Sequence, residues 1–438
     1  MLKSLVFGCS PCEIGWNHFT QNAPDKADTY NQVPLIITRG IWTPSLLYFD
    51  ASRRLCHKYP WLIGISMGCV LLSSTLFTMI AANAALLLLF LAYRVSATPS
   101  LTLDVLAPKS VTDNDDLNLQ VTLTNTGNVP LKLLNDPNSI LSKSKADTFS
   151  ISSKSCVPKF TGLRVNYNPS QAAKSTNPSA FTVLVPGQTV KFKRNLAGTY
   201  DFTQCGLGTY TFSASNIFNY VDESGESKTI KASTNPAQFE IAGKFSAPST
   251  STSTRHNAVS KRDISFDGCN DDQKKQIKQA VVRSNALISN ALSYLARINP
   301  EEPGLLYITW FGEFNTLYYN NAMSQFKKIR VKATSITYDC TACLAQPGVD
   351  YSTTSAYINV EVPGKIYLCG KFWEAPINGA GTKSGIIVHE LSHFPQDEEI
   401  LGTNDYVYGR KAAQDFAISQ PQFAPLNADN IQFFAENV

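Results

Sequence analysis

One short stretch of the sequence carries residue types that could hold a catalytic metal ion. His389 and His393 stand four positions apart, and Glu390 follows the first of them, in the pattern His-Glu-x-x-His. The run 385–388 before them is mostly apolar, which is typical of the buried face of a helix. On a helix, positions i and i+4 share one face, so both imidazoles can bind one Zn²⁺. Zinc lowers the pKa of bound water toward about 7, and Glu390 could then accept the proton.

A catalytic zinc also needs a third protein ligand. The chain has five histidines, and the other three are His18, His57 and His256, all far upstream of the motif. The third ligand is therefore expected to be a carboxylate or a thiolate. The acidic candidates after the motif are Asp397, Glu398, Glu399, Asp405 and Asp415. Asp405 follows Gly402, so a glycine turn could return it to the metal, although it also fits an ordinary helix N-cap.

The elements around the motif predict an α+β domain over residues 263–438. A long amphipathic helix is predicted from the N-cap cluster at 270–272 to Leu295, because apolar residues recur there at helical spacing. Short strands are predicted at 305–310, 329–337, 356–360 and 365–368, and helices at 384–394, 405–418 and 428–436.

Residues 98–245 have the pattern of an all-β, sandwich-like module of antiparallel strands. Apolar and polar residues alternate at 101–105 and 117–124, the period of a half-buried strand. Further strands are predicted at 181–185, 189–192, 210–214 and 239–242. Cys156 and Cys205 are expected to pair with each other in an oxidising compartment, the alternative being a free thiol that caps a metal.

The Ser/Thr-rich stretch 246–262 separates the two modules and reads as a solvated linker. It ends in Lys261-Arg262, a dibasic pair of the kind that kexin-like processing proteases cut. Cleavage there would release residues 263–438 from the β-rich module.

Residues 61–97 contain a long uncharged stretch that predicts a transmembrane or signal segment. Met79 could begin a signal peptide, and an uncleaved type II anchor is the alternative. Basic residues precede the stretch, so both interpretations place the chain after 97 outside the cytosol. Residues 1–60 carry no pattern that indicates a function.

The overall composition argues against one class of function, nucleic-acid binding. The chain of 438 residues has 38 basic and 34 acidic residues, a balance too even to indicate nucleic-acid binding. Only 16% of its residues are charged, which agrees with a chain that carries a membrane or export segment.

The segment Gly402-Thr403-Asn404-Asp405-Tyr406-Val407-Tyr408-Gly409 matches the pattern G-T-x-D-x-x-Y-G. With His-Glu-x-x-His upstream, residues 263–438 resemble the aspzincins, the family of deuterolysin and peptidyl-Lys metalloendopeptidase. The resemblance implies a zincin-like domain with Asp405 as third zinc ligand, and Tyr408 as hydrogen-bond donor to the oxyanion. It also implies a β-rich propeptide and the disulfides Cys269–Cys340 and Cys343–Cys369.

These observations predict a secreted zinc endopeptidase made as a zymogen, with one Zn²⁺ and protein substrates. Its partners would be its own propeptide and a kexin-like protease, and it would contact membrane only through an uncleaved N-terminal segment. Lysine-selective relatives have two acidic residues in the pocket for the residue after the cleaved bond; Asp429 matches the first, but Gln432 is neutral. A preference for lysine is thus expected from Asp429 alone, which also fits a helix N-cap. The alternative function is a catalytically silent zinc-containing binding protein.

Overall fold

The computed structural model describes residues 97–113, 116–243, 245, 264–395 and 402–438. The predictions for residues 1–96, for Lys261-Arg262 and for the acidic residues 397–399 lie outside the described residues. Val95–Val438 forms one compact unit. Within the part that the structure describes, none of the helices has the length and apolar character needed to cross a membrane.

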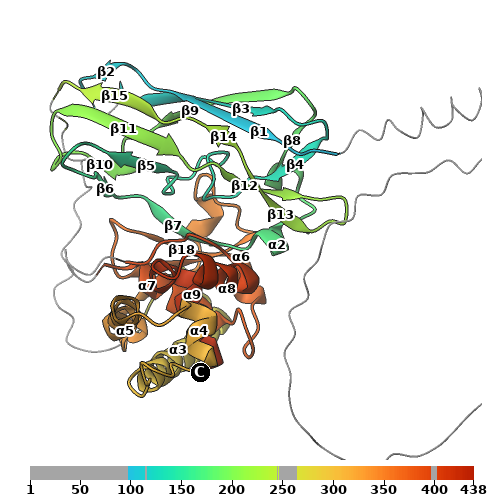
Figure 1. The fold of residues 1–438 in the computed structure, drawn as a ribbon. Helices are drawn as coiled ribbons and strands as arrows, with labels where there is room; N and C mark the ends of the chain where they lie inside the picture. Colours follow the sequence, from blue (N-terminus) through green and yellow to red (C-terminus); the bar gives the residue numbers. More distant parts are fainter. Residues whose placement is uncertain (1–96, 114–115, 244, 246–263, 396–401) are drawn as a thin grey trace, which may run out of the picture. The chain divides into compact units, whose positions relative to one another are not determined.

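The N-terminal part of this unit is built mainly from β-strands (Figure 1). The strands are β1 (Leu101–Leu106), β2 (Ser110–Val111), β3 (Asn118–Asn125), β4 (Leu131–Leu134), β5 (Phe149–Ser152), β6 (Lys159–Phe160), β7 (Leu163–Tyr167), β8 (Phe181–Leu184), β9 (Thr189–Asn195), β10 (Tyr200–Asp201), β11 (Gly208–Ala214), β12 (Ile217–Val221), β13 (Ser227–Lys231), β14 (Ser233–Thr234) and β15 (Ala237–Ile241), and a short helix α2 (Pro169–Ala172) follows β7. The six strands predicted from the sequence all lie within or overlap strands of this set.

Three four-stranded sheets and one strand pair organise this part. The orders are β14-β1-β3-β9, β2-β15-β11-β5 and β13-β12-β4-β8, with β10 beside β6. Residues of β1 and β3 alternate between buried and exposed, and their buried side chains share one core with those of β11 and β15. Pairing is antiparallel except that β14 and β2 run parallel to their neighbours, so the fully antiparallel arrangement expected from the sequence is not what forms. Cys156 is bonded to Cys205.

The C-terminal part combines helices with one small sheet. Its helices are α3 (Asp271–Leu295), α4 (Leu305–Phe311), α5 (Thr316–Ile329), α6 (Gly370–Glu374), α7 (Lys383–His393), α8 (Arg410–Ser419) and α9 (Ala428–Asn437). Its strands are β16 (Ser265–Asp267), β17 (Thr337–Asp339), β18 (Thr354–Asn359) and β19 (Lys365–Leu368). The sheet order is β16-β17-β19-β18-β7, so its fifth strand comes from the N-terminal part of the chain.

Two of the predicted elements in this part are wrong, and one predicted helix begins later than expected. The strand expected at 305–310 is helix α4, in which Tyr307, Trp310 and Phe311 are buried at helical spacing. The strand expected at 329–337 overlaps β17 only at Thr337, because α5 ends at Ile329 and a 3₁₀ turn intervenes. The helix expected at 405–418 begins only at Arg410, after a glycine with positive φ, so Asp405 is not the N-cap of that helix.

Helix α3 forms as predicted and fixes the position of α7. The Asn270 side chain accepts a hydrogen bond from the backbone N–H of Gln273, whose side chain accepts one from the N–H of Asn270, a complete capping box. One apolar face of α3 is buried in the core that α7 and α9 also line. Within that core, the Ser284 hydroxyl donates to the carbonyl oxygen of Ser384 at 3.0 Å, which ties α3 to the first turn of α7.

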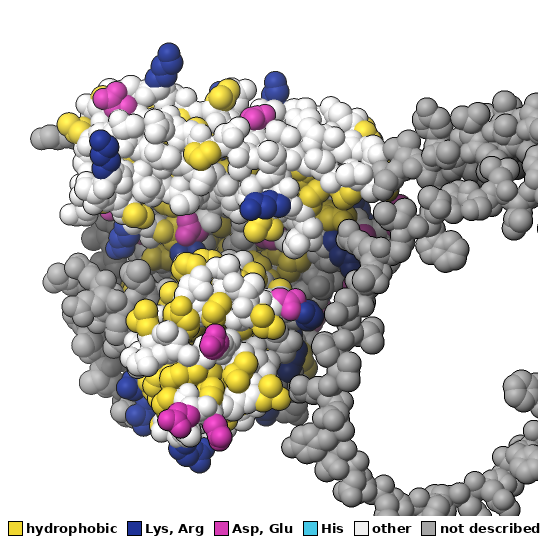
Figure 2. All heavy atoms as spheres, in the orientation of Figure 1, with side chains coloured by type: hydrophobic (Ala, Val, Ile, Leu, Met, Phe, Trp, Pro, Cys, Tyr) yellow, Lys and Arg dark blue, Asp and Glu magenta, His cyan; other side chains and the backbone are white. Residues whose placement is uncertain are grey.

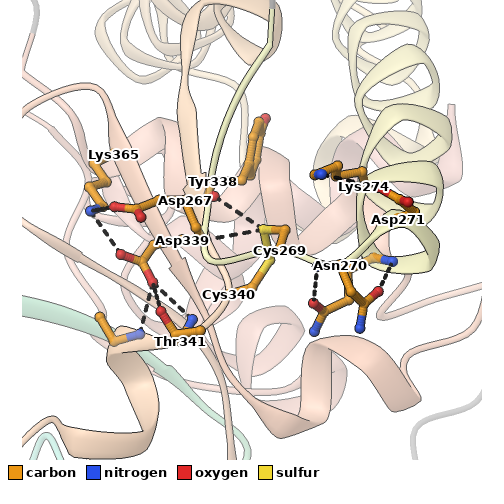
Figure 3. Close-up of a disulfide and its surroundings, with 12 residues drawn as sticks. Asp267, Cys269, Asn270, Asp271, Lys274, Tyr338, Asp339, Cys340, Thr341 and Lys365 are labelled. Carbon is orange, nitrogen blue, oxygen red and sulfur yellow. Dashed lines mark hydrogen bonds and ion pairs between the residues drawn. A yellow bond between two sulfur atoms is a disulfide. The ribbon is translucent and has the colours of Figure 1, made fainter.

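Two disulfides tie the C-terminal part together, Cys269–Cys340 and Cys343–Cys369, the pairing that the family resemblance implies. Figure 3 shows the first of them at the start of α3, beside a small ion-pair network. In that network, the ammonium group of Lys365 lies 2.7 Å from a carboxylate oxygen of Asp267 and 2.8 Å from one of Asp339.

The double substitution Cys269→Ser, Cys340→Ser is expected to lower the free energy of unfolding by about 2–5 kcal/mol. The bond closes a loop with a sequence separation of 71, so breaking it frees a long segment of the unfolded chain. Urea denaturation followed by tryptophan fluorescence measures this, because both described tryptophans, Trp310 and Trp373, lie in this part. Ser289→Ala on the exposed side of α3 is the control, and an unchanged midpoint in the double variant would contradict the expectation.

Candidate metal centre

Helix α7 carries the predicted motif and buries it. His389 and Glu390 have no exposed surface, and His393 is 2% exposed. The helix begins with Thr382 as N-cap, whose hydroxyl accepts a hydrogen bond from the backbone N–H of Gly385. Among the described residues, no histidine is visible on the face drawn in Figure 2, which agrees with this burial. The helical spacing therefore places both imidazoles on one inward face, as the sequence predicts.

Asp405 joins the two histidines. One atom each from His389, His393 and Asp405 lie within 4.8 Å of one another, a group that could hold a metal ion. The Nε2 atoms of the histidines are 3.1 Å and 3.3 Å from Oδ1 of Asp405, whose side chain is 4% exposed. None of these nitrogen and oxygen atoms has a hydrogen-bond partner within the described residues.

The Nδ1 atoms of the two histidines make hydrogen bonds, and these orient the rings so that both Nε2 atoms face Asp405. Nδ1 of His393 is 2.9 Å from the carbonyl oxygen of Thr403, and Nδ1 of His389 is 2.8 Å from Oδ1 of Asp429. Because these oxygens accept, the Nδ1 atoms carry the protons when the rings are neutral. Two Nε2 lone pairs and a carboxylate then converge on one buried point, and a divalent cation such as Zn²⁺ fits that donor set.

The electrostatic interactions among these residues support the same interpretation. Although burial works the other way, the two histidines hold the pKa of Asp405 well below its usual range. Burial also opposes protonation of His389, yet its contacts with Asp405 and Asp429 raise its pKa well above the usual value. Burial lowers the pKa of His393, so positive charge beside Asp405 is favoured on His389.

The segment 402–409 brings Asp405 to α7 by a close approach. A Cβ atom on Gly402 would lie 1.8 Å from the carbonyl oxygen of His393, so only glycine fits there. The backbone N–H of Thr403 donates to the carbonyl of Ser392 at 2.9 Å, and that of Tyr406 donates to the Asn427 side chain at 2.9 Å. The segment is therefore held between α7 and α9. Sequence reasoning anticipated the glycine turn but not the role of Asn427.

Glu390 and Tyr408 lie at the same centre. Burial raises the pKa of Glu390 to about 8, and neither of its carboxylate oxygens makes a hydrogen bond within the described residues. Burial also raises the pKa of Tyr408 well above its usual value, so its hydroxyl stays protonated. That hydroxyl donates to the carbonyl oxygen of Val165 in β7 at 3.3 Å. Tyr408 lies in the loop before α8 rather than on the helix, contrary to the sequence-based expectation.

The chain is similar in sequence to two known metalloendopeptidases. The chain is 36% identical over 353 residues to "Peptidyl-Lys metalloendopeptidase" of Grifola frondosa, covering 80% of this chain and 96% of that protein. The protein of the same name from Armillaria mellea is 36% identical, over 79% of this chain and 94% of that one. This chain belongs to the aspzincin family.

Two further sequence comparisons agree with that assignment. The aspzincin M35 family model, described as lysine-specific metallo-endopeptidase, matches residues 299–436. "Extracellular protease" of Aeromonas hydrophila is 30% identical over 74% of this chain and 88% of that protein. The solved "zinc peptidase from Grifola frondosa" is 32% identical over 39% of this chain and 97% of that one, with a TM-score of 0.35. This aspzincin is a metalloendopeptidase.

Asp429 of this aspzincin contacts one of the candidate metal ligands, His389, through its side chain. Besides His389, it accepts a hydrogen bond from the backbone N–H of Gly409, and its side chain is 7% exposed. A cavity of about 370 Å³ is lined by residues that include Asp429, Gln432, Gly409 and Arg410. The substrate-binding role of Asp429 stays a prediction. Its hydrogen bond with His389 gives it a second role, that of orienting this imidazole, which the local sequence does not reveal.

Asp429→Asn is expected to weaken zinc binding by about 10–100-fold, because the neutral amide orients His389 less well and makes it less basic. Competition with a chelator of known affinity measures the change in the aspzincin. Asp415→Asn is the matched control, since Asp415 is exposed and pairs with Lys411 at the surface. Equal zinc affinity in wild type and Asp429→Asn would refute an orienting role for Asp429.

Proposed function

We propose that this aspzincin is a secreted zinc endopeptidase made as a zymogen. Residues 263–438 would form a zincin-like catalytic domain with one Zn²⁺, and the β-rich, sandwich-like residues 98–245 its propeptide. The observation that carries the proposal is the convergence of unsatisfied donor atoms from His389, His393 and Asp405 at one buried point. Burying these atoms without partners costs free energy, and a cation bound at that point would offset this cost.

The residues around that point have separate roles in hydrolysis. Zinc held by the three ligands would supply a Lewis acid that lowers the pKa of water and polarises a peptide carbonyl. Glu390 would accept the proton of the attacking water and pass it to the leaving amine, because its carboxylate is buried and makes no hydrogen bond to any residue that the structure describes. The neutral Tyr408 hydroxyl would donate to the oxygen on which negative charge develops.

The substrates are proposed to be proteins with a preference for lysine after the cleaved bond. Two relatives are named peptidyl-Lys metalloendopeptidases. The cavity beside the centre is lined by Asp429, by the neutral Gln432 and by Glu374, whose carboxylate pairs with Lys371. Because Gln432 provides no second charge beside Asp429, a lysine ammonium is attracted more weakly there, so a relaxed preference for lysine is expected.

Export of the chain is proposed from three separate observations. Three disulfides lie in the described residues, and such bonds persist in oxidising compartments. The uncharged stretch within 61–97 would act as signal or anchor, and one relative is named an extracellular protease. A kexin-like protease would then cut after Lys261-Arg262.

Cleavage-site mapping by mass spectrometry tests the function. Processed protein is incubated with a denatured protein substrate, with and without a chelator that removes zinc. Chelator-sensitive cuts, enriched before lysine, are the expected result. No cuts by folded, zinc-loaded and processed protein would overturn the proposal, and cuts spread evenly over residue types would remove the lysine preference alone.

A further inference from the structure

Strand β7 occupies the edge of the catalytic sheet. It pairs antiparallel with β18, with Val165 opposite Tyr357 and Asn166 opposite Ala356. β7 and the helices of the C-terminal part lie on either side of β18 in Figure 1. Without β7, the sheet order leaves β18 as an edge strand, whose backbone groups could pair with an extended peptide.

The side chains of β7 fix its register on this edge. Leu163 and Val165 are 5% and 0% exposed, and they pack in one apolar cluster with Tyr357 and the Cys343–Cys369 disulfide. A shift by one residue would turn both side chains out of this cluster, so the register is strongly determined.

That register brings one peptide bond of β7 to the metal centre. The Val165 carbonyl oxygen accepts a hydrogen bond from the Tyr408 hydroxyl, the group proposed to bind the oxyanion of a substrate. The next residue, Asn166, is buried and lines the cavity that contains Asp429.

We infer that residues 163–167 occupy the substrate-binding cleft in the direction of a substrate, with the Val165–Asn166 bond at the scissile position, and thereby keep the precursor inactive. This inference rests on the proposed function and specifies how the propeptide acts. Contacts outside the cleft strengthen the hold: the Ser142 hydroxyl donates to the carbonyl of Gly348 at 2.7 Å, and the Asn177 amide to the Asp350 carboxylate at 3.3 Å.

Two features explain why the bound segment is not cut. Asn166 is shorter than lysine and uncharged, so it leaves the cavity beside Asp429 unfilled. In addition, the Asn138 side chain donates to the Val165 carbonyl oxygen at 2.9 Å, which holds that oxygen within the propeptide. The segment therefore binds as an extended peptide but lacks the residue that the cavity is proposed to select.

Val165→Asp in the uncut precursor tests the block. The new charge would lie in the apolar cluster and displace β7 from β18. We expect the intact precursor, verified by its mass, to cleave an added protein at least ten-fold faster than uncut wild type. Val183→Asp, at an exposed position of β8, is the matched control and should behave as wild type. An equally inactive, folded and zinc-loaded Val165→Asp precursor would overturn the inference, provided that processed wild type is active. An inactive processed wild type would instead count against the proposed function.

Asn166→Lys tests the direction of binding, with Asn166→Gln as its control. In Asn166→Lys, water should add to the Val165 carbonyl carbon, the bond to the nitrogen of residue 166 should break, and that nitrogen should leave as an amine. Mass spectrometry is expected to find this cut in Asn166→Lys and to miss it in Asn166→Gln and in the double variant Asn166→Lys, Glu390→Gln. Absence of the cut in a zinc-loaded Asn166→Lys, Asn138→Ala precursor, which also lacks the hydrogen bond to the Val165 carbonyl, would overturn the substrate-like direction.

Discussion

Glu390→Gln is expected to lower the rate of peptide hydrolysis by a factor of about 10²–10⁴ while zinc stays bound. Gln has nearly the same shape as Glu, and Glu390 is not among the three converging ligands, so the site keeps its metal. The amide cannot accept the proton of the attacking water, so the step that Glu390 performs is lost. Rates on a lysine-containing peptide and zinc content per chain are measured on the same processed preparation.

The matched control is Glu361→Gln, at an exposed position after β18, which should keep both activity and zinc. Activity of Glu390→Gln within a few-fold of wild type would show that another group takes the proton. A folded and zinc-loaded wild type without activity would instead favour the catalytically silent binding protein that the sequence alone left open.

The candidate metal centre could be predicted from the sequence because most of its residues are close together in the chain. His389, Glu390 and His393 lie within five consecutive positions of one helix, and helical geometry alone places the two imidazoles together. Asp405 needed the family pattern, because spacing alone left it among five acidic candidates. The structure brings Asp405 to the two histidines, although it lies in a loop before α8 and not on the helix.

The strand wrongly expected at α4 shows where pattern reading is weakest. The stretch 305–311 is rich in aromatic and aliphatic residues and has a glycine on each side, which favours a strand. Its buried residues nevertheless recur at positions i, i+3 and i+4. A helix of about two turns contains too few residues for its helical spacing to be distinguished from a strand, so the strand-like composition decided the prediction.

Contacts between distant segments could not be read from the sequence. Strand β7 was not among the predicted strands, because its partner β18 lies nearly two hundred residues further along the chain. The hydrogen bond between Asp429 and His389 likewise joins α9 to α7 across 40 positions. Each depends on packing of the whole unit rather than on local pattern.

Asp405→Ala is expected to remove zinc from the purified enzyme and to reduce hydrolysis at least as far as Glu390→Gln does. The substitution leaves only the two histidines, and zinc sites in enzymes need three protein ligands. It also leaves His389 and His393 buried without their shared carboxylate. Zinc content by elemental analysis and peptide hydrolysis are the measurements, with Asp415→Ala as the surface control.

Comparing Glu390→Gln with Asp405→Ala distinguishes a residue that acts in catalysis from a residue that binds the zinc ion. Glu390→Gln should be inactive with zinc bound, whereas Asp405→Ala should be inactive because zinc is lost, and added zinc should restore little activity. An Asp405→Ala enzyme that keeps one zinc per chain and full activity would show that the third ligand is a different carboxylate. Asp397, Glu398 and Glu399 would then be the residues to replace, because they follow the same helix within a few positions.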